Sequence, residues 1–213
     1  MADEYLYCRS NTRSTCGFLD DYACETMALL SLYAATGTSV YLEHAQAVCR
    51  EAISQFADKA GGYFLYGTKN DPLITKPKEC YDGALPSGNS VMAFCLVRLS
   101  QLTTDDTFRQ EAEKQLAFLA QEAARYPAGY SMYLTALLFY RNPPHKITVL
   151  LSKEDTGRQI LPQLPLFADV TMLKHETEAY RQINGRTTYY VCQKHTCLPP
   201  VNLLPASSRR QLV

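Results

Sequence analysis

Hydrophobic and polar positions alternate in two different ways along the first two thirds of the chain, and they predict paired helices. Residues 39–57 and 104–126 carry apolar side chains at three- and four-residue spacing, with charged side chains between them. This pattern is typical of a helix covered on one side. Residues 18–37, 86–102 and 128–140 are apolar on most sides, so we expect helices buried on both faces. The alternation predicts a mainly α fold, either a partial α/α toroid of antiparallel helix pairs or an ordinary helix bundle.

The pattern changes to a β type after Pro143-Pro144, because two successive residues without N–H groups cannot continue a helix. Short apolar runs rich in β-branched residues then flank a helical piece at residues 155–161. Their order predicts one small sheet within a small α/β element. The predicted strands are residues 146–151, 168–173 and 187–192.

These patterns divide the chain into four parts. Residues 1–17 have no periodicity and are interpreted as a lead-in, and residues 18–142 hold the partial toroid. Residues 143–202 hold the α/β element, and residues 203–213 are predicted to be a flexible tail. Within the toroid, two short β-like runs in residues 61–76 predict a hairpin before the second inner helix.

The composition narrows the range of partners. The 213 residues include 21 Lys plus Arg and 21 Asp plus Glu, so there is no positive excess for nucleic acid or an anionic membrane. No apolar run approaches the roughly 18 residues of a membrane span, and the start of the sequence has no signal-peptide pattern. We expect a soluble, cytoplasmic protein. Five helices are too few to close a ring, and the exposed apolar edges predict a homodimer.

The cysteines are predicted to be free thiols. Three of the eight lie within helical apolar patterns and are expected in the core, where a thiol acts as a small hydrophobe. Cys192 and Cys197, with His195 between them, allow a zinc site, a redox pair or a structural turn. A zinc site needs four ligands and a redox pair has closer spacing, so we predict reduced thiols, no metal and no cofactor. The three core cysteines are Cys24, Cys49 and Cys95.

A loop rich in turn-forming residues precedes the second inner helix; residues 76–90 read KPKECYDGALPSGNS. Pro86 suits the first turn of a helix, and Gly88 allows a close approach of other atoms. Asp82 and Asn89 then lie near a helix N-terminus, where unpaired N–H groups favour anionic or hydroxyl-rich ligands. The same residues also suit a rigid turn with capping side chains, so both interpretations stay open.

The stretch at residues 76–90 resembles the signature of a thioredoxin-domain-containing family, that of spermatogenesis-associated protein 20 and its bacterial relatives. Three further motifs resemble this family in the same order, so the resemblance covers nearly the whole chain. They are GFLDDYA at residues 17–23, GGYF at residues 61–64 and YYVCQKHTCLPPV at residues 189–201.

The resemblance implies a thioredoxin-like domain followed by an α/α toroid similar to N-acylglucosamine 2-epimerases and six-hairpin glycosidases. Only the C-terminal part of that plan is present here, so a thioredoxin-like domain is an implied partner. The chain has no Cys-x-x-Cys pair, and redox chemistry would therefore belong to that partner domain. Epimerase-like histidines cannot be identified, which leaves a pair of carboxylates as the candidate for chemistry on a sugar.

Asp21 and Asp82 are the predicted catalytic pair. Each is expected at the start of an inner helix, and successive inner helices of a toroid run in the same direction, so both would face one cleft. This predicts a module that binds or processes carbohydrate by acid–base chemistry. The alternative is a non-catalytic scaffold for the thioredoxin-like domain, with both aspartates acting as helix caps. The predicted substrate-binding residues are Tyr81, Lys78, Ser87, Asn89, Ser90 and Tyr22.

Overall fold

The computed structural model describes residues 16–70, 74–165, 168–193 and 196–204 of the chain. Residues 205–213 of the predicted tail (203–213), and all but the end of the predicted lead-in, lie outside these ranges. The chain divides into two compact units, residues 1–142 and residues 143–213.

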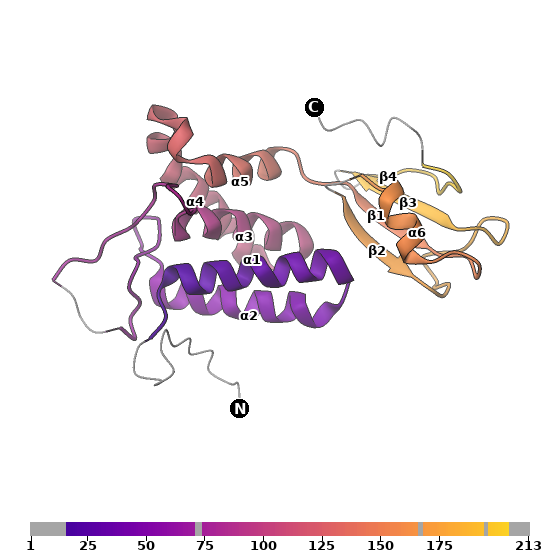
Figure 1. Cartoon of the computed structure of the whole chain (residues 1–213), viewed down its shortest axis with the longest axis horizontal. Helices are drawn as coiled ribbons and strands as arrows, with labels where there is room; N and C mark the ends of the chain where they lie inside the picture. The colour runs from indigo at the N-terminus through magenta and orange to yellow at the C-terminus, as the bar shows by residue number, and fades with distance from the viewer. Residues whose placement is uncertain (1–15, 71–73, 166–167, 194–195, 205–213) are drawn as a thin grey trace. The chain divides into compact units, whose positions relative to one another are not determined.

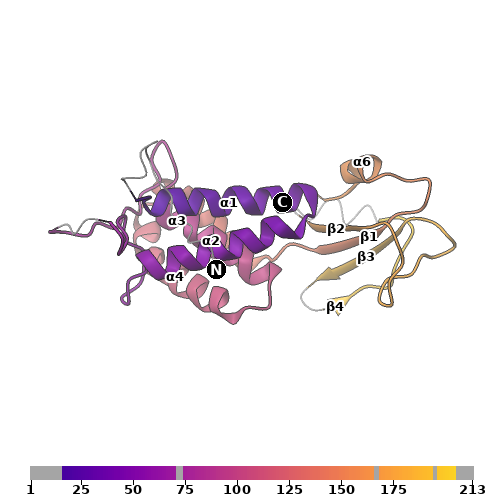
Figure 2. The ribbon, with the colours of Figure 1, turned by 90° about the horizontal axis from the view of Figure 1, so that it is seen from below.

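The first unit consists of helices that pack in pairs. Helix α1 packs along α2, and α3 packs along α4; α3 also packs against α1 and α5 and lies in the middle of the unit. Figures 1 and 2 show α1 and α2 side by side in both views. The helices are α1 (Leu19–Thr36), α2 (Ser39–Phe56), α3 (Gly88–Leu102), α4 (Asp106–Arg125) and α5 (Ser131–Arg141), with a 3₁₀ turn at Pro127–Gly129.

Local side chains explain where these helices begin and end. Ser87 precedes α3, and its hydroxyl accepts a hydrogen bond from the Ser90 N–H at 3.2 Å. Asp105 does the same for α4 by accepting from the Thr107 N–H at 2.9 Å. Gly37 ends α1 in the left-handed conformation, with φ at 67°, which glycine adopts without steric cost. The helix boundaries therefore follow ordinary capping chemistry.

The core of the helical unit lies around α3, which is buried on nearly every side. This confirms the prediction that the helix is buried on both faces. The same prediction is wrong for α1, because its buried residues lie on one face and Leu32 and Cys24 are exposed. Cys49 and Cys95 are fully buried, as expected. An all-round apolar pattern shows what a helix can bury, whereas the neighbours that are present decide what it does bury.

Two local predictions before α3 are wrong. Pro86 does not occupy the first turn of the helix, because α3 begins at Gly88 and Ser87 takes the capping position. The predicted hairpin at residues 61–76 is an irregular loop in its described part, with a single bridge between Ala57 and Tyr63. The loop's backbone groups bond instead to distant positions, as when the Leu65 N–H donates to the Pro77 carbonyl at 2.9 Å.

The second unit contains a four-stranded sheet with the order β2-β1-β3-β4. Strand β1 pairs in parallel with β2 and antiparallel with β3, and the hairpin from β3 adds β4. The three predicted strands thus form one sheet, as expected. Its own apolar cluster includes Ile147, Val149 and Val191 from the sheet and Ile160 from the crossover. The elements are β1 (Lys146–Leu150), α6 (Gly157–Ile160), a 3₁₀ turn (Leu161–Gln163), β2 (Asp169–Leu173), β3 (Thr188–Gln193) and β4 (Thr196–Cys197).

Cys192 and Cys197 form a disulfide, which corrects the prediction that both thiols are free. They are paired cross-strand positions of β3 and β4, with their Cα atoms 4.0 Å apart. This register, which the spacing in the sequence did not reveal, brings the two sulfur atoms into bonding range. A bonded pair cannot serve as zinc ligands, and His195, the third candidate ligand, lies outside the described residues.

The disulfide predicts the number of free thiols. In denaturant without reductant, we expect a thiol-reactive dye to titrate six groups, two fewer than the eight cysteines of the sequence. Reduction should then destabilise the sheet unit by about 2 kcal/mol, because the bond closes a short loop in the unfolded chain. The Cys192→Ser/Cys197→Ser double variant serves as the control, since reductant should not change its stability. Titration of all eight thiols in the wild-type chain would contradict the bond.

Candidate functional site

Asp82 lies in the segment at residues 76–90, called the signature loop below, and accepts hydrogen bonds from two directions. Its Oδ1 accepts hydrogen bonds from the N–H of Ser87 at 2.9 Å and from the Ser87 hydroxyl at 3.2 Å. Its Oδ2 accepts from the N–H of Met132, in the first turn of α5, at 2.8 Å. The residue is only 6% exposed. Asp82 therefore joins the turn before α3 to the start of α5, fifty residues later in the chain.

Asn89 makes a second set of hydrogen bonds between segments; it lies in the first turn of α3 and is fully buried. Its side-chain oxygen accepts from the N–H of Tyr63 at 2.8 Å and from Nε2 of Gln115 at 3.0 Å. Its Nδ2 donates to the carbonyl groups of Tyr63 and Glu79, both at 2.9 Å. These bonds occupy both donors and both acceptor positions of the amide, so Asn89 has no capacity left for a ligand.

Lys78 ties the other side of the loop to the turn after α2. Its Nζ donates to Oδ2 of Asp58 and to the Gly61 carbonyl, each at 2.6 Å, and lies 4.9 Å from the ring centre of Phe118. The hydrogen bond from Lys78 lowers the pKa of the Asp58 carboxyl below its usual range. The contribution of this pair to stability is thus present at neutral pH and is lost as the pH falls through that lowered pKa.

The start of α1 lies against the start of α3. A side chain at Gly88 would place its Cβ only 2.3 Å from Oδ1 of Asp20, so this close approach requires glycine. Asp21 lies one residue further on, within the first turn of α1, where its carboxylate accepts from the N–H of Phe18 at 2.8 Å. The sequence analysis missed Asp20, the carboxylate that meets α3. The nearby Gly88 was the signal that could have identified it.

Most of the predicted substrate-binding residues are directed into the protein. Tyr22 is buried, and its hydroxyl accepts from Nε2 of Gln55 at 3.0 Å. Ser90 is fully buried, and Ser87 is nearly so. These residues form the interior of the loop and helix junction, so in this conformation they present no surface to a ligand. The catalytic assignment of Asp21 and Asp82 itself stays a prediction.

Tyr81 is the exception, with 58% of its surface exposed. Its ring lies parallel to that of Tyr126, which is also exposed, with centroids 6.3 Å apart, and it meets Tyr130 edge-on. Gly129 allows this packing, because a Cβ there would lie 2.4 Å from the Tyr81 ring. The exposed Leu85 belongs to the same loop. The loop thus presents aromatic and apolar surface outward at Tyr81 and Leu85, while the carboxylate of Asp82 is buried.

Cys80 lies within this loop and is partly buried. Burial raises the pKa of the Cys80 thiol to about 11, so the thiol is protonated at neutral pH, whereas a nucleophile needs the thiolate.

No cluster of three or more His, Cys, Asp or Glu side chains suited to a metal occurs among the described residues. Nor does any helix in the described part of the chain have the length and apolarity to cross a bilayer.

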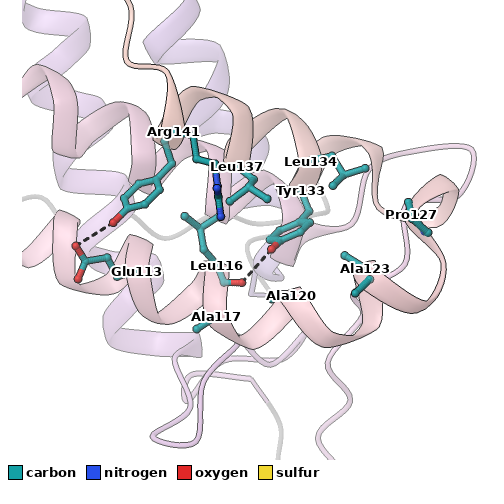
Figure 3. Close-up of a pocket in the computed structure, with 12 residues that line it drawn as sticks. Glu113, Leu116, Ala117, Ala120, Ala123, Pro127, Tyr133, Leu134, Leu137 and Arg141 are labelled. Atoms are coloured by element: carbon teal, nitrogen blue, oxygen red, sulfur yellow. Dashed lines mark hydrogen bonds between the residues drawn. The ribbon is translucent and has the colours of Figure 1, made fainter. Parts of the chain in front are cut away.

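A groove between α4 and α5 is a second candidate site (Figure 3). It has a volume of about 590 Å³, and most of its lining is apolar. The Tyr133 ring lies between the two helices, and its hydroxyl donates to the Leu116 carbonyl at 3.2 Å. At the other end, the Tyr140 hydroxyl donates to Oε1 of Glu113 at 3.2 Å. The lining residues are Glu113, Leu116, Ala117, Ala120, Ala123, Ala124, Pro127, Tyr133, Leu134, Leu137, Tyr140 and Arg141.

Comparison with known proteins shows a relationship to spermatogenesis-associated protein 20. The human protein is 27% identical over 203 residues, and the rat protein is 25% identical over 213 residues. Each match covers 87% of this chain but only 26% of the relative, so the chain spans about a quarter of these proteins. An uncharacterised Caenorhabditis elegans protein is 30% identical over 97 residues, which cover 46% of this chain and 13% of that protein. No protein-family model matches the chain.

Proposed function

We propose that this relative of spermatogenesis-associated protein 20 is a non-catalytic interaction module, a segment of an α/α toroid that supports a partner domain. The proposed partner is the thioredoxin-like domain that the sequence resemblance implies. Support for the toroid comes from the paired helices and from the starts of α1, α3 and α5, which meet through Gly88 and Asp82. The partner and the role are inferences about the larger assembly.

The observation that carries this proposal is the use of Asp82. A general acid or base must reach the substrate and exchange a proton with it. The Asp82 carboxylate is buried, and its oxygens accept from Ser87 on one side and from Met132 on the other. Asp21 likewise accepts a backbone N–H at the start of α1. Asp82 thus ties two distant segments together and Asp21 caps its own helix, and both roles suit a rigid supporting module.

A carbohydrate-binding role is the second candidate, and the exposed tyrosines favour it. Tyr81 and Tyr126 present parallel aromatic rings at the surface, and flat aromatic faces suit sugar rings. In this version the signature loop binds a saccharide on its outer side. Asp82 lies behind the loop and fixes its conformation, so a carbohydrate-processing reaction would need Asp82 to become accessible to the sugar.

Thermal denaturation of the full chain with and without sugars tests the two candidates. A ligand that binds only the folded state raises the melting temperature, by an amount set by the ratio of its concentration to its Kd. As an interaction module, the chain should show no shift with a panel of mono- and oligosaccharides. A shift that disappears in Tyr126→Ala would establish sugar binding and overturn the proposal. Tyr41→Ala, a partly buried tyrosine on α2, controls for general loss of stability.

A further inference from the structure

The groove between α4 and α5 leaves α5 incompletely covered. Only Tyr133 and Ala136 of α5 are buried, while Leu134, in the groove lining, is 38% exposed and Leu138, outside that lining, is 60% exposed. The sequence of this helix is apolar on most sides, and such a helix is ordinarily covered on both faces. The first unit covers one face through α3 and α4. The other face exposes apolar surface, and such surface commonly marks an interaction site.

The shape of the groove fits a helix. Its lining on α4 extends from Glu113 to Ala124, about 16 Å of helix at 1.5 Å per residue, which is about three turns. The exposed floor of the groove is made of small residues, Ala117, Ala120 and Ala124, which recur along one face of α4. Small side chains let a neighbouring helix approach closely, so its larger apolar side chains can enter the groove.

The charges at one end of the groove specify the occupant further. Glu113 already accepts from the Tyr140 hydroxyl and pairs with Arg109 at 3.6 Å. Arg141, at the last turn of α5, lines the same groove and has no ion pair among the residues that the structure describes. A carboxylate on the incoming helix would complement Arg141. The preferred occupant therefore has an apolar ridge and an acidic group at the end that meets Arg141.

From this geometry we infer that the groove between α4 and α5 binds an amphipathic, acidic-ended α-helix of a partner protein. This inference rests on the proposed interaction role and assigns it a surface. The α5 helix of a second copy fits less well, because its only charged residue is Arg141 and it would bring no carboxylate to the groove.

A synthetic peptide helix tests the inference directly. The probe is a helical peptide of about 14 residues with leucines along one face, a glutamate at one end and one tryptophan. The chain contains no tryptophan, so peptide fluorescence reports binding without background from the protein. We expect saturable binding to the full chain, which should be absent for a peptide of the same composition with its leucines distributed around the helix. A peptide with lysine in place of glutamate should bind more weakly.

Variants locate the binding surface. Ala120→Arg places a long charged side chain on the groove floor and should weaken peptide binding at least tenfold. Gln121→Arg adds the same side chain at the next exposed position of α4, outside the groove lining, and should leave binding unchanged. Arg141→Glu should weaken binding of the acidic peptide about two- to fivefold, as expected for an exposed ion pair, and reverse the preference for glutamate over lysine.

Three results would overturn the inference. They are failure of every amphipathic peptide to bind, equal effects of Ala120→Arg and Gln121→Arg, and self-association of the chain that Ala120→Arg abolishes. The last result would assign the groove to a second copy. The proposed function fails by a different observation, a sugar-dependent thermal shift. Loss of peptide binding without such a shift would therefore remove this surface and leave the interaction role to another one.

Discussion

Replacing Asn89 with leucine should cost on the order of 4 kcal/mol of folding free energy, the largest effect we expect from a single substitution. Leucine has the same branched shape, but two methyl groups replace the amide oxygen and nitrogen. It would leave the buried N–H and carbonyl of Tyr63 without their partner, and it would remove the part-buried hydrogen bond to the Glu79 carbonyl. Each unsatisfied buried group costs about 1–3 kcal/mol. The measurement is urea denaturation of the helical unit, followed by far-UV circular dichroism.

Asn142→Leu is the matched control for this experiment. Asn142 is exposed, and its side chain makes a single long hydrogen bond to the Leu138 carbonyl at 3.3 Å. A surface change of this kind typically alters stability by less than about 0.5 kcal/mol. Equal urea midpoints for Asn89→Leu and wild type would show that the hydrogen bonds of the Asn89 side chain do not stabilise the fold.

Replacing Asp82 with alanine should destabilise the helical unit by about 3 kcal/mol. The change removes a charged acceptor from two backbone N–H groups, those of Ser87 and Met132, and hydrogen bonds to charged groups are worth about 1.5–3 kcal/mol each. Asp82→Asn is the graded control, because its amide keeps one acceptor oxygen and should cost about half as much. Chemical denaturation of the two variants measures the difference.

The ranking of these Asp82 variants bears on function. If Asp82 joins the turn before α3 to α5, Asp82→Asn should destabilise the helical unit less than Asp82→Ala does. A residue kept for chemistry would give the opposite outcome, with stability unchanged or increased when the charge is removed. Two variants as stable as the wild type would therefore contradict the structural role of Asp82 and reopen the catalytic prediction.

Helices that are buried on one face only were predicted well from the sequence, and so was the change from helices to strands. The three- and four-residue spacing of α2 and α4 predicted one-sided helices, and Pro143-Pro144 marked the change to the β pattern. The apolar pattern of α5 predicted burial on both faces, and this is wrong. The pattern alone cannot indicate which apolar residues have a neighbour within the chain. For the same reason, Cys24 was placed in the core although it lies on the open side of α1.

The structural roles of Asp82 and Asn89 could not be predicted from the local sequence pattern. Asn89 bonds to Gln115 and to Tyr63, each 26 positions away, and Asp82 to a donor 50 positions away. Only the packed fold brings such partners together. The disulfide required the register of β3 and β4, which spacing does not give. The sequence did place Asp82 and Asn89 beside a helix start, where both a ligand and an internal tie are chemically reasonable.

The division between Asn142 and Pro143 affects how folding of this chain should be understood. Each unit has its own apolar cluster, one around α3 and one on the sheet. Two separate cores allow the chain to melt in two steps, so a single unfolding free energy is not a property of the whole polypeptide. Partial unfolding could then release the sheet while the helices persist, as in proteins whose parts open independently during hydrogen exchange. A proteolytic cut at this junction would leave two fragments, each with its own apolar cluster.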